Sequence, residues 1–232
     1  MSAPSGSVRE VRVKTEDGVE LEGVLLIPPE SSLPSSREEL QEQRRHLGVL
    51  LTHPHPKLGG DMHNNVVTAL ARGLTKQGFT ILAINFRGVG NSQGSSSWAG
   101  KDERKDVKAA LEFLKQQPDI QGVGLVGYSF GSAVGCGVDC DGLKGYVAVS
   151  YPYGRVASCA LGSHFKLADR NLPKLFLIGK DDQFANVNSL ESFVTGMDHP
   201  GKVEVFDNVD HFWHGEEKKL LQPVSTFLDS LL

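Results

Sequence analysis

Short apolar runs alternate with helical patterns from residue 47 to the end of the chain. The runs predict strands at residues 48–52, 79–84, 123–126, 143–150, 174–178 and 203–206. Helical patterns lie at residues 64–76, 102–116, 130–138, 187–197 and 216–232. Buried strands that alternate with helices indicate a mostly parallel, twisted sheet with helices on both faces. We therefore predict an α/β fold.

Two further segments precede this pattern. Residues 8–13 and 19–27 are rich in β-forming residues and flank Glu16-Asp17-Gly18, which predicts a hairpin. Residues 28–46 are polar and rich in Ser, Pro, Glu and Arg, and we expect an exposed loop with one short helical turn. We interpret 28–46 as a surface insertion within a single domain that spans residues 1–232. The sequence does not indicate whether this insertion binds a partner.

Composition narrows the class of protein. Apolar residues make up 39%, charged residues 22%, and the net charge is −4, so no basic surface suggests a nucleic-acid partner. The polar start of the chain and the lack of a long apolar run argue against a secretory signal and a membrane partner. The cysteines Cys136, Cys140 and Cys159 are few and odd in number, so we expect free thiols and a cytoplasmic protein.

Glycine is over-represented, with 26 of 232 residues against a usual ~7%. The string Gly122-Val123-Gly124-Leu125-Val126-Gly127 matches the dinucleotide-binding pattern G-x-G-x-x-G. A dinucleotide site needs those glycines after a strand and at the start of a helix, whereas here they occupy the predicted strand itself. We therefore expect no nucleotide and no other cofactor.

The pattern G-x-S-x-G occurs twice, around Ser92 and around Ser129. A nucleophile elbow is a sharp turn from a strand into a helix, and it requires small neighbours. Ser129 follows a predicted strand directly and precedes the mostly small residues 131–137. Ser92 lies well beyond the end of its strand, and no helix begins until about residue 102. Ser129 is therefore the candidate nucleophile, and Ser92 is interpreted as a loop serine.

A serine nucleophile needs a base to accept its proton and an acid to orient that base. In a parallel sheet these groups come from the carboxyl ends of later strands. The strand at 174–178 is followed by Asp181 and Asp182, and the strand at 203–206 by His211. The order Ser129, Asp182, His211 is the Ser…Asp…His order of a hydrolase triad.

The acid and the base each have alternatives. The Gly-x-x-Asp spacing after the strand favours Asp182, with Asp181 left open. Asp210 is next to His211, and adjacent side chains seldom face each other, so we interpret Asp210 as a residue that shapes the loop. His214 lies further from the strand end and is the less favoured base.

Attack on a carbonyl group also requires hydrogen-bond donors for the developing oxyanion. One donor is the backbone N–H of Phe130, which follows the nucleophile. The second should come from the loop after the first parallel strand, where Pro54 and Pro56 have no N–H. This leaves His55 or Lys57, and position favours His55.

His53, His55 and His63 also suggest a metal site, because imidazole is a zinc ligand. No acidic or thiol partner completes such a site nearby in the sequence. We therefore expect no metal.

Four strings together resemble a known family. They are His53-Pro54-His55-Pro56-Lys57-Leu58-Gly59-Gly60, Asn85-Phe86-Arg87-Gly88-Val89-Gly90-Asn91-Ser92-Gln93-Gly94, Gly127-Tyr128-Ser129-Phe130-Gly131 and Asp210-His211-Phe212-Trp213-His214-Gly215. They resemble the small α/β-hydrolases related to dienelactone hydrolases.

The resemblance implies an α/β-hydrolase fold in which Ser129 is the nucleophile and His211 is the base. It places the acid in the pair Asp181-Asp182. It further implies that residues 85–94 form a structural loop beside the site, anchored by Arg87.

Residues 151–173 are too few for a helical lid, so we expect no cap domain and a shallow, open site. Tyr151, Tyr153 and Phe165 in this segment, together with Trp213, could form an aromatic wall that binds substrate over Ser129. The alternative is that these rings simply cover the edge of the sheet.

These residues favour a cytoplasmic serine hydrolase that cleaves small-molecule esters of small or medium acyl groups through an acyl-enzyme. A small peptidase or acyl-peptide hydrolase is an alternative within hydrolases. A ligand-binding or scaffold protein with the same fold but no catalysis is an alternative from another class. The sequence does not indicate an oligomeric state.

Overall fold

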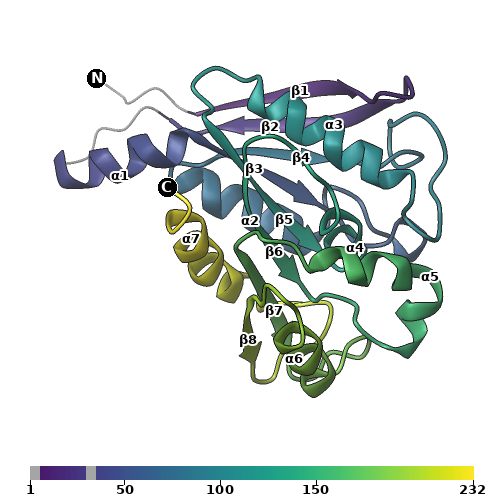
Figure 1. Cartoon of the computed structure of the whole chain (residues 1–232). Coiled ribbons are helices and arrows are strands. Elements are labelled where there is room, and N and C mark those ends of the chain that lie inside the picture. The colour runs from purple at the N-terminus through teal and green to yellow at the C-terminus, as the bar shows by residue number, and fades with distance from the viewer. Residues whose placement is uncertain (1–5, 30–34) are drawn as a thin grey trace.

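The structure is a computed structural model that describes residues 6–29 and 35–232. Its described residues form strands β1 (Ser7–Lys14), β2 (Glu20–Ile27), β3 (Leu47–Thr52), β4 (Thr80–Ile84), β5 (Gly122–Tyr128), β6 (Leu143–Val149), β7 (Lys174–Gly179) and β8 (Lys202–Phe206). They make one sheet in the order β1-β2-β4-β3-β5-β6-β7-β8 (Figure 1). The pairs β1–β2 and β2–β4 are antiparallel, and the other neighbours are parallel. The predicted α/β fold and hairpin are confirmed.

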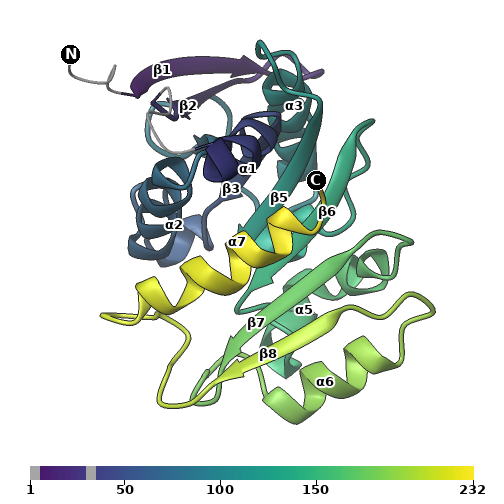
Figure 2. The ribbon, with the colours of Figure 1, turned by 90° about the vertical axis from the view of Figure 1, so that its left-hand side faces the viewer.

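Helices cover both faces of this sheet. They are α1 (Ser35–Arg45), α2 (Asn65–Lys76), α3 (Glu103–Lys115), α4 (Phe130–Gly135), α5 (Arg155–Phe165), α6 (Val187–Thr195) and α7 (Leu221–Asp229). Helices α3 to α6 bury side chains in one apolar cluster, and α2 and α7 bury theirs in the cluster on the opposite face. Figure 2 shows α7 crossing that opposite face over β5 and β6.

The central strands supply both clusters because successive side chains of a strand point to opposite faces. In β3, Val49 and Leu51 enter one cluster and Leu50 enters the other. All six residues of β3 are buried. This burial explains why the parallel strands appear in the sequence as continuous apolar runs.

The expected loop at residues 28–46 is corrected by the structure. Residues 35–45 form α1, a helix of 11 residues rather than one short turn, while residues 30–34 lie outside the described residues. Arg44 in its last turn binds Asp229 of α7 through two hydrogen bonds of 2.7 and 2.6 Å. The segment is too polar to show the apolar periodicity from which a helix is predicted.

The loop after β4 is held by a buried ion pair. Arg87 donates from its backbone N–H and its guanidinium to Asp106 at 2.7 to 2.9 Å, and its guanidinium also reaches Asp17. The Asp106 side chain is 0% exposed, so its charge depends on this one partner. The expectation that Arg87 anchors the loop is confirmed. Ser92 in the same loop donates to the carbonyl of Asn85, as befits a loop serine.

The turn from β5 into α4 is sharp and strained. Ser129 occupies it with φ 51° and ψ −116°, a conformation that residues with a Cβ atom rarely adopt. A Cβ atom on Gly127 would lie 2.5 Å from the Cα of Ser132. A Cβ atom on Gly131 would lie 2.6 Å from the Oγ1 of Thr52. The excess of glycine thus has a local cause, because the turn closes only where side chains are absent.

We expect Arg87→Met to lower the free energy of unfolding by about 3–5 kcal/mol, because it leaves the Asp106 carboxylate buried without a counter-charge. Urea denaturation measures this loss. The matched control is Lys105→Met, which removes a solvent-accessible cation that pairs with Asp17 and Asp102 and should lower the free energy of unfolding far less than Arg87→Met. Equal losses in the two variants would contradict the assignment.

We expect Ser129→Gly to be more stable than Ser129→Ala by about 1 kcal/mol. Glycine relieves the strain of about 1–3 kcal/mol at this turn and gives back part of that gain through its larger unfolded-state entropy. Thermal and urea denaturation of the two variants provide the comparison. An alanine variant as stable as the glycine variant would show that the turn is not strained.

Candidate active site

The carboxyl ends of β3, β5, β7 and β8 bring four loops to one edge of the sheet. This edge is the usual ligand-binding position in an open parallel sheet. β5 is followed by Ser129, β7 by Asp182, and β8 by His211. The side chains that the sequence singles out from three distant segments therefore meet at one point.

Ser129, His211 and Asp182 form a hydrogen-bonded series. The Nε2 atom of His211 lies 2.9 Å from the Oγ of Ser129, and its Nδ1 lies 2.8 and 2.9 Å from the two carboxylate oxygens of Asp182. The carboxylate can only accept, so Nδ1 carries the hydrogen and Nε2 is free to accept the serine proton. The side chains of His211 and Asp182 are 6% and 0% exposed, which shields these bonds from water.

The alternatives for acid and base lie elsewhere. Asp181 is exposed and its backbone N–H donates to the carbonyl of Val209. His214 is also exposed and stacks on Phe212, with their ring centroids 5.8 Å apart. Asp210 accepts from the N–H groups of Phe212 and Trp213, which is the loop-shaping position expected for it.

Three hydrogen-bond donors that the sequence did not reveal support the series. The hydroxyl of Tyr128 donates to the carbonyl of His211 at 2.8 Å, and burial raises the pKa of that hydroxyl, so it keeps its proton. Asp182 also accepts from the N–H groups of Phe184 and Ala185 at 2.8 and 3.0 Å, which orients its carboxylate. Tyr128 occupies the variable position before the serine in G-x-S-x-G, and nothing in that pattern reveals its role.

Two backbone N–H groups are available beside Ser129. Within the described chain, neither the N–H of Phe130 nor that of His55 has a hydrogen-bond partner. The N–H of Lys57, the alternative that the sequence left open, donates to the Nδ1 of the His55 side chain at 3.1 Å. Because Lys57 is occupied, His55 is the donor that remains in this loop. Burial lowers the pKa of His55, so its ring is neutral near pH 7.

A cavity of about 180 Å³ opens onto Ser129. It is lined by Pro54, His55, Leu58, Asn64, Trp98, Tyr128, Ser129, Phe130, Pro152, Leu161, Phe184, His211 and Phe212. Leu58, Trp98, Phe184 and Phe212 in this lining are large apolar side chains that are at least 38% exposed. The mouth of the site is therefore apolar.

The predicted aromatic wall of Tyr151, Tyr153 and Trp213 is wrong. Tyr151 is 0% exposed and packs among core rings, and Tyr153 stacks on Phe193 with their centroids 4.2 Å apart. Trp213 is also 0% exposed, and its indole N–H donates to the Oγ of Ser150. All three residues lie close to strand ends. Their side chains point into or against the core, however, and not toward Ser129.

Phe165 belongs to the core as well, at 6% exposed. Residues 151–173, expected to be too few for a helical lid, do contain the helix α5. Its Leu161 enters the cavity lining. Trp98 comes from the loop before α3, where its ring packs on His55 at a centroid distance of 4.7 Å. No short motif marks Trp98, so its exposure in the structure is the signal that identifies it.

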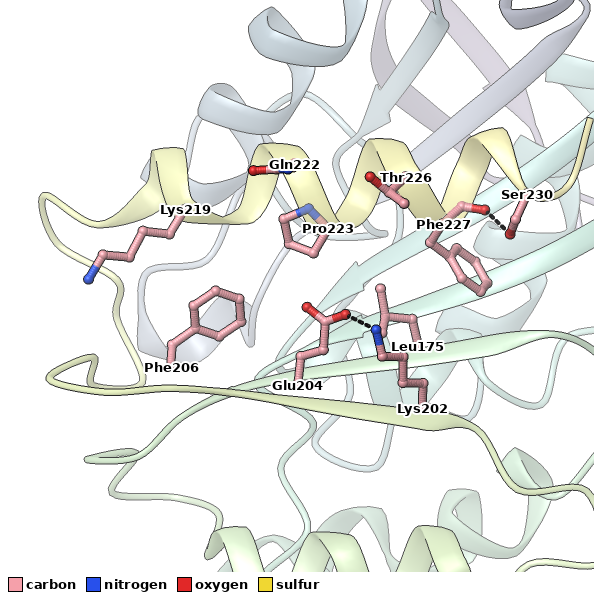
Figure 3. A pocket seen from close by; sticks show the side chains of 10 residues that line it. All are labelled: Leu175, Lys202, Glu204, Phe206, Lys219, Gln222, Pro223, Thr226, Phe227 and Ser230. Carbon is pink, nitrogen blue, oxygen red and sulfur yellow. Dashed lines mark hydrogen bonds and ion pairs between the residues drawn. The ribbon is translucent and has the colours of Figure 1, made fainter.

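A larger hollow of about 650 Å³ lies between α7 and strands β7 and β8, and Figure 3 shows its side chains. Lys202 and Glu204 form an ion pair within it at 2.5 Å, and Ser230 donates to the carbonyl of Phe227. It contains none of the groups that meet at Ser129, so it does not compete as the reactive site.

Among residues 6–29 and 35–232, no group of three or more His, Cys, Asp or Glu side chains is arranged to hold a metal ion. None of the helices in these residues combines the length and the apolar character that a membrane span requires.

Comparisons with known proteins agree with this architecture. A family model described as the α/β hydrolase fold matches residues 56–137. An α/β serine hydrolase without a lid from Xanthomonas campestris has a TM-score of 0.79 at 22% identity, over 100% of this chain and 97% of that one. An α/β serine hydrolase homologue from Coxiella burnetii has a TM-score of 0.76 at 26% identity, over 95% and 97% of the two chains.

An esterase from Pyrococcus furiosus has a TM-score of 0.74 at 18% identity and covers 99% of each chain, which is a likeness of fold. The sheet, the strained turn and the family model lead to one conclusion. The chain has the α/β-hydrolase fold and resembles α/β serine hydrolases of known structure.

Proposed function

We propose that this hydrolase cleaves carboxylic esters of small or medium acyl groups through an acyl-enzyme. Ser129 is the nucleophile, His211 the general base and Asp182 the acid that orients the base. The observation that carries the proposal is the hydrogen-bonded series from Ser129 through His211 to Asp182, with each distance at 2.8 or 2.9 Å.

The reaction divides into two transfers of the acyl group. His211 Nε2 takes the proton of Ser129 as its Oγ attacks the ester carbonyl carbon, and the carbonyl oxygen becomes an oxyanion. The oxyanion accepts hydrogen bonds from the N–H groups of Phe130 and His55. The C–O bond to the alcohol then breaks, and His211 returns the proton to the leaving oxygen. Water attacks the acyl-enzyme by the same route and releases the carboxylic acid and free Ser129.

Asp182 supports this cycle without exchanging a proton. Its buried carboxylate keeps the hydrogen of His211 on Nδ1 and stabilises the imidazolium that forms when Nε2 is protonated. The hydroxyl of Tyr128 holds the His211 backbone by its hydrogen bond to the carbonyl. The base is thus fixed toward Ser129 before substrate arrives, which lowers the cost of reorganisation during attack.

The cavity supports a neutral acyl group of limited length. Its described lining has no ionisable side chain apart from Tyr128, His55 and His211. A volume of about 180 Å³ is below the ~300–1,000 Å³ of typical small-molecule pockets, which favours a small acyl group. Longer chains must lie over the exposed apolar mouth. The Pyrococcus furiosus esterase, which has a similar fold, adds support for an ester substrate.

We expect a fluorophosphonate probe to label the wild-type protein with loss of fluoride, and the protein to hydrolyse p-nitrophenyl butyrate. Ser129→Ala should abolish both, because it removes the attacking oxygen. Ser92→Ala removes the serine of the other G-x-S-x-G string and should leave labelling intact. Intact-mass spectrometry detects the label. A wild type that is neither labelled nor active would favour a ligand-binding role and overturn the proposal.

Asp182→Asn should lower kcat by about 10³–10⁴-fold, because the amide stabilises the wrong tautomer of His211 and no imidazolium. Asp181→Asn is the matched control and should change kcat by less than about threefold, since that side chain is exposed. Initial-rate kinetics with p-nitrophenyl butyrate measure both. A larger loss at Asp181 would mean that the carboxylate seen beside His211 is not the one that acts.

A further inference from the structure

His53 is fully buried, does not line the cavity and has no part in the mechanism above, yet both of its ring nitrogens are engaged. Nε2 lies 3.0 Å from the backbone nitrogen of Phe86, and Nδ1 lies 2.7 Å from the carbonyl oxygen of Pro54. The N–H of Phe86 can only donate, so Nε2 accepts and Nδ1 carries the hydrogen. The tautomer is fixed, and His53 donates to Pro54.

The carbonyl of Pro54 shares its peptide unit with the N–H of His55. The described chain has no cis peptide bond, so this unit is trans and planar, and its N–H points opposite to its C=O. A bond that fixes the direction of the carbonyl therefore fixes the direction of the N–H as well. That N–H is the second donor to the oxyanion in the proposed reaction.

Gly60 holds the same peptide from another side. A Cβ atom on Gly60 would lie 2.1 Å from the carbonyl oxygen of Pro54 and 2.5 Å from its carbonyl carbon. The N–H of Gly60 also donates to the carbonyl of His55 at 3.1 Å. The absence of a side chain at Gly60 thus lets the backbone lie against this peptide.

We propose that His53 is a positioning residue that aims the His55 N–H at the oxyanion through its hydrogen bond to the Pro54 carbonyl. The inference rests on the proposed hydrolase function and deepens it. His53 also ties this loop to Phe86, whose ring lies edge-on to Phe130, the residue of the first donor. The two oxyanion donors are thereby held in a fixed position relative to each other.

The protonation state of His53 agrees with this role. Burial lowers the pKa of His53 to about 4, so the ring is neutral at the pH at which esters are assayed. A neutral ring keeps the lone pair of Nε2 for Phe86 and the hydrogen of Nδ1 for Pro54. The donor therefore stays in place across the range in which His211 must act as a base.

Two amide variants separate the two ring nitrogens. The amide nitrogen of His53→Asn can occupy the place of Nδ1 and donate to Pro54, whereas the amide oxygen of His53→Gln can occupy the place of Nε2 and accept from Phe86. We expect His53→Asn to stay within about threefold of the wild-type kcat. We expect His53→Gln to lower kcat by about 10–100-fold with KM unchanged, because a misdirected donor weakens only the transition state.

A trifluoromethyl ketone, which adds to the serine and leaves an oxyanion, provides a second readout. Its inhibition constant should rise in His53→Gln by the same factor as kcat falls, and should stay near the wild-type value in His53→Asn. Gly60→Ala displaces the same peptide without touching His53. It should give the same split between kcat and KM, which keeps the proposal testable if His53→Gln fails to fold.

Two kinetic results would contradict the proposal. Equal kinetics in the two His53 variants, or a fall in kcat matched by a rise in KM in both His53→Gln and Gly60→Ala, would overturn the positioning role. Fluorophosphonate labelling of Ser129 in the wild type tells this failure apart from failure of the proposed function. If the wild type is not labelled, the function and the inference that rests on it both fall.

Discussion

The sharp turn between β5 and α4 is the constraint on which the site depends. It holds Ser129 at a positive φ and presents the hydroxyl beyond the edge of the sheet. The turn closes only because Gly127 and Gly131 bring backbone against backbone. Gly131 lies against Thr52 and the carbonyl of His53, so the same contact that makes room for the elbow brings the loop after β3 beside it. The positions of the nucleophile and of the second backbone donor therefore both depend on this close glycine packing.

The other groups of the site, His211 and Asp182, are held in position by hydrogen bonds that involve the backbone and not only by contact with Ser129. Tyr128 holds the carbonyl of His211, Asp210 shapes the loop that follows, and the backbone after β7 orients the Asp182 carboxylate. Arg87 and Asp106 fix the loop after β4 in the same way. The bonds that Tyr128 and Arg87 donate are buried, and burial strengthens them because water does not compete for their partners. The loops at this edge of the sheet are thereby held in one arrangement.

Predictions from the sequence succeed where chemistry follows directly from position along the chain. Ser129 stands at the junction of a strand and a helix, and His211 and Asp182 follow later strands, so sheet topology alone brings them near each other. Predictions fail where the role of a residue depends on the direction in which its side chain points. Tyr151 and Trp213 stand close to strand ends, but their rings turn into the core. Trp98 lies in an irregular loop, where no periodicity assigns a face, and so it was missed.

The sequence by itself determined the α/β fold and the serine that is the candidate nucleophile, because periodicity and glycine spacing are local signals. It also narrowed the acid to two neighbouring aspartates. Only the tertiary structure decided that Asp182 and not Asp181 meets His211, and that Lys57 leaves His55 as the available donor. It also decided which rings surround the cavity. Adjacent residues differ in which way they point, and that direction is set by packing between segments far apart in the chain.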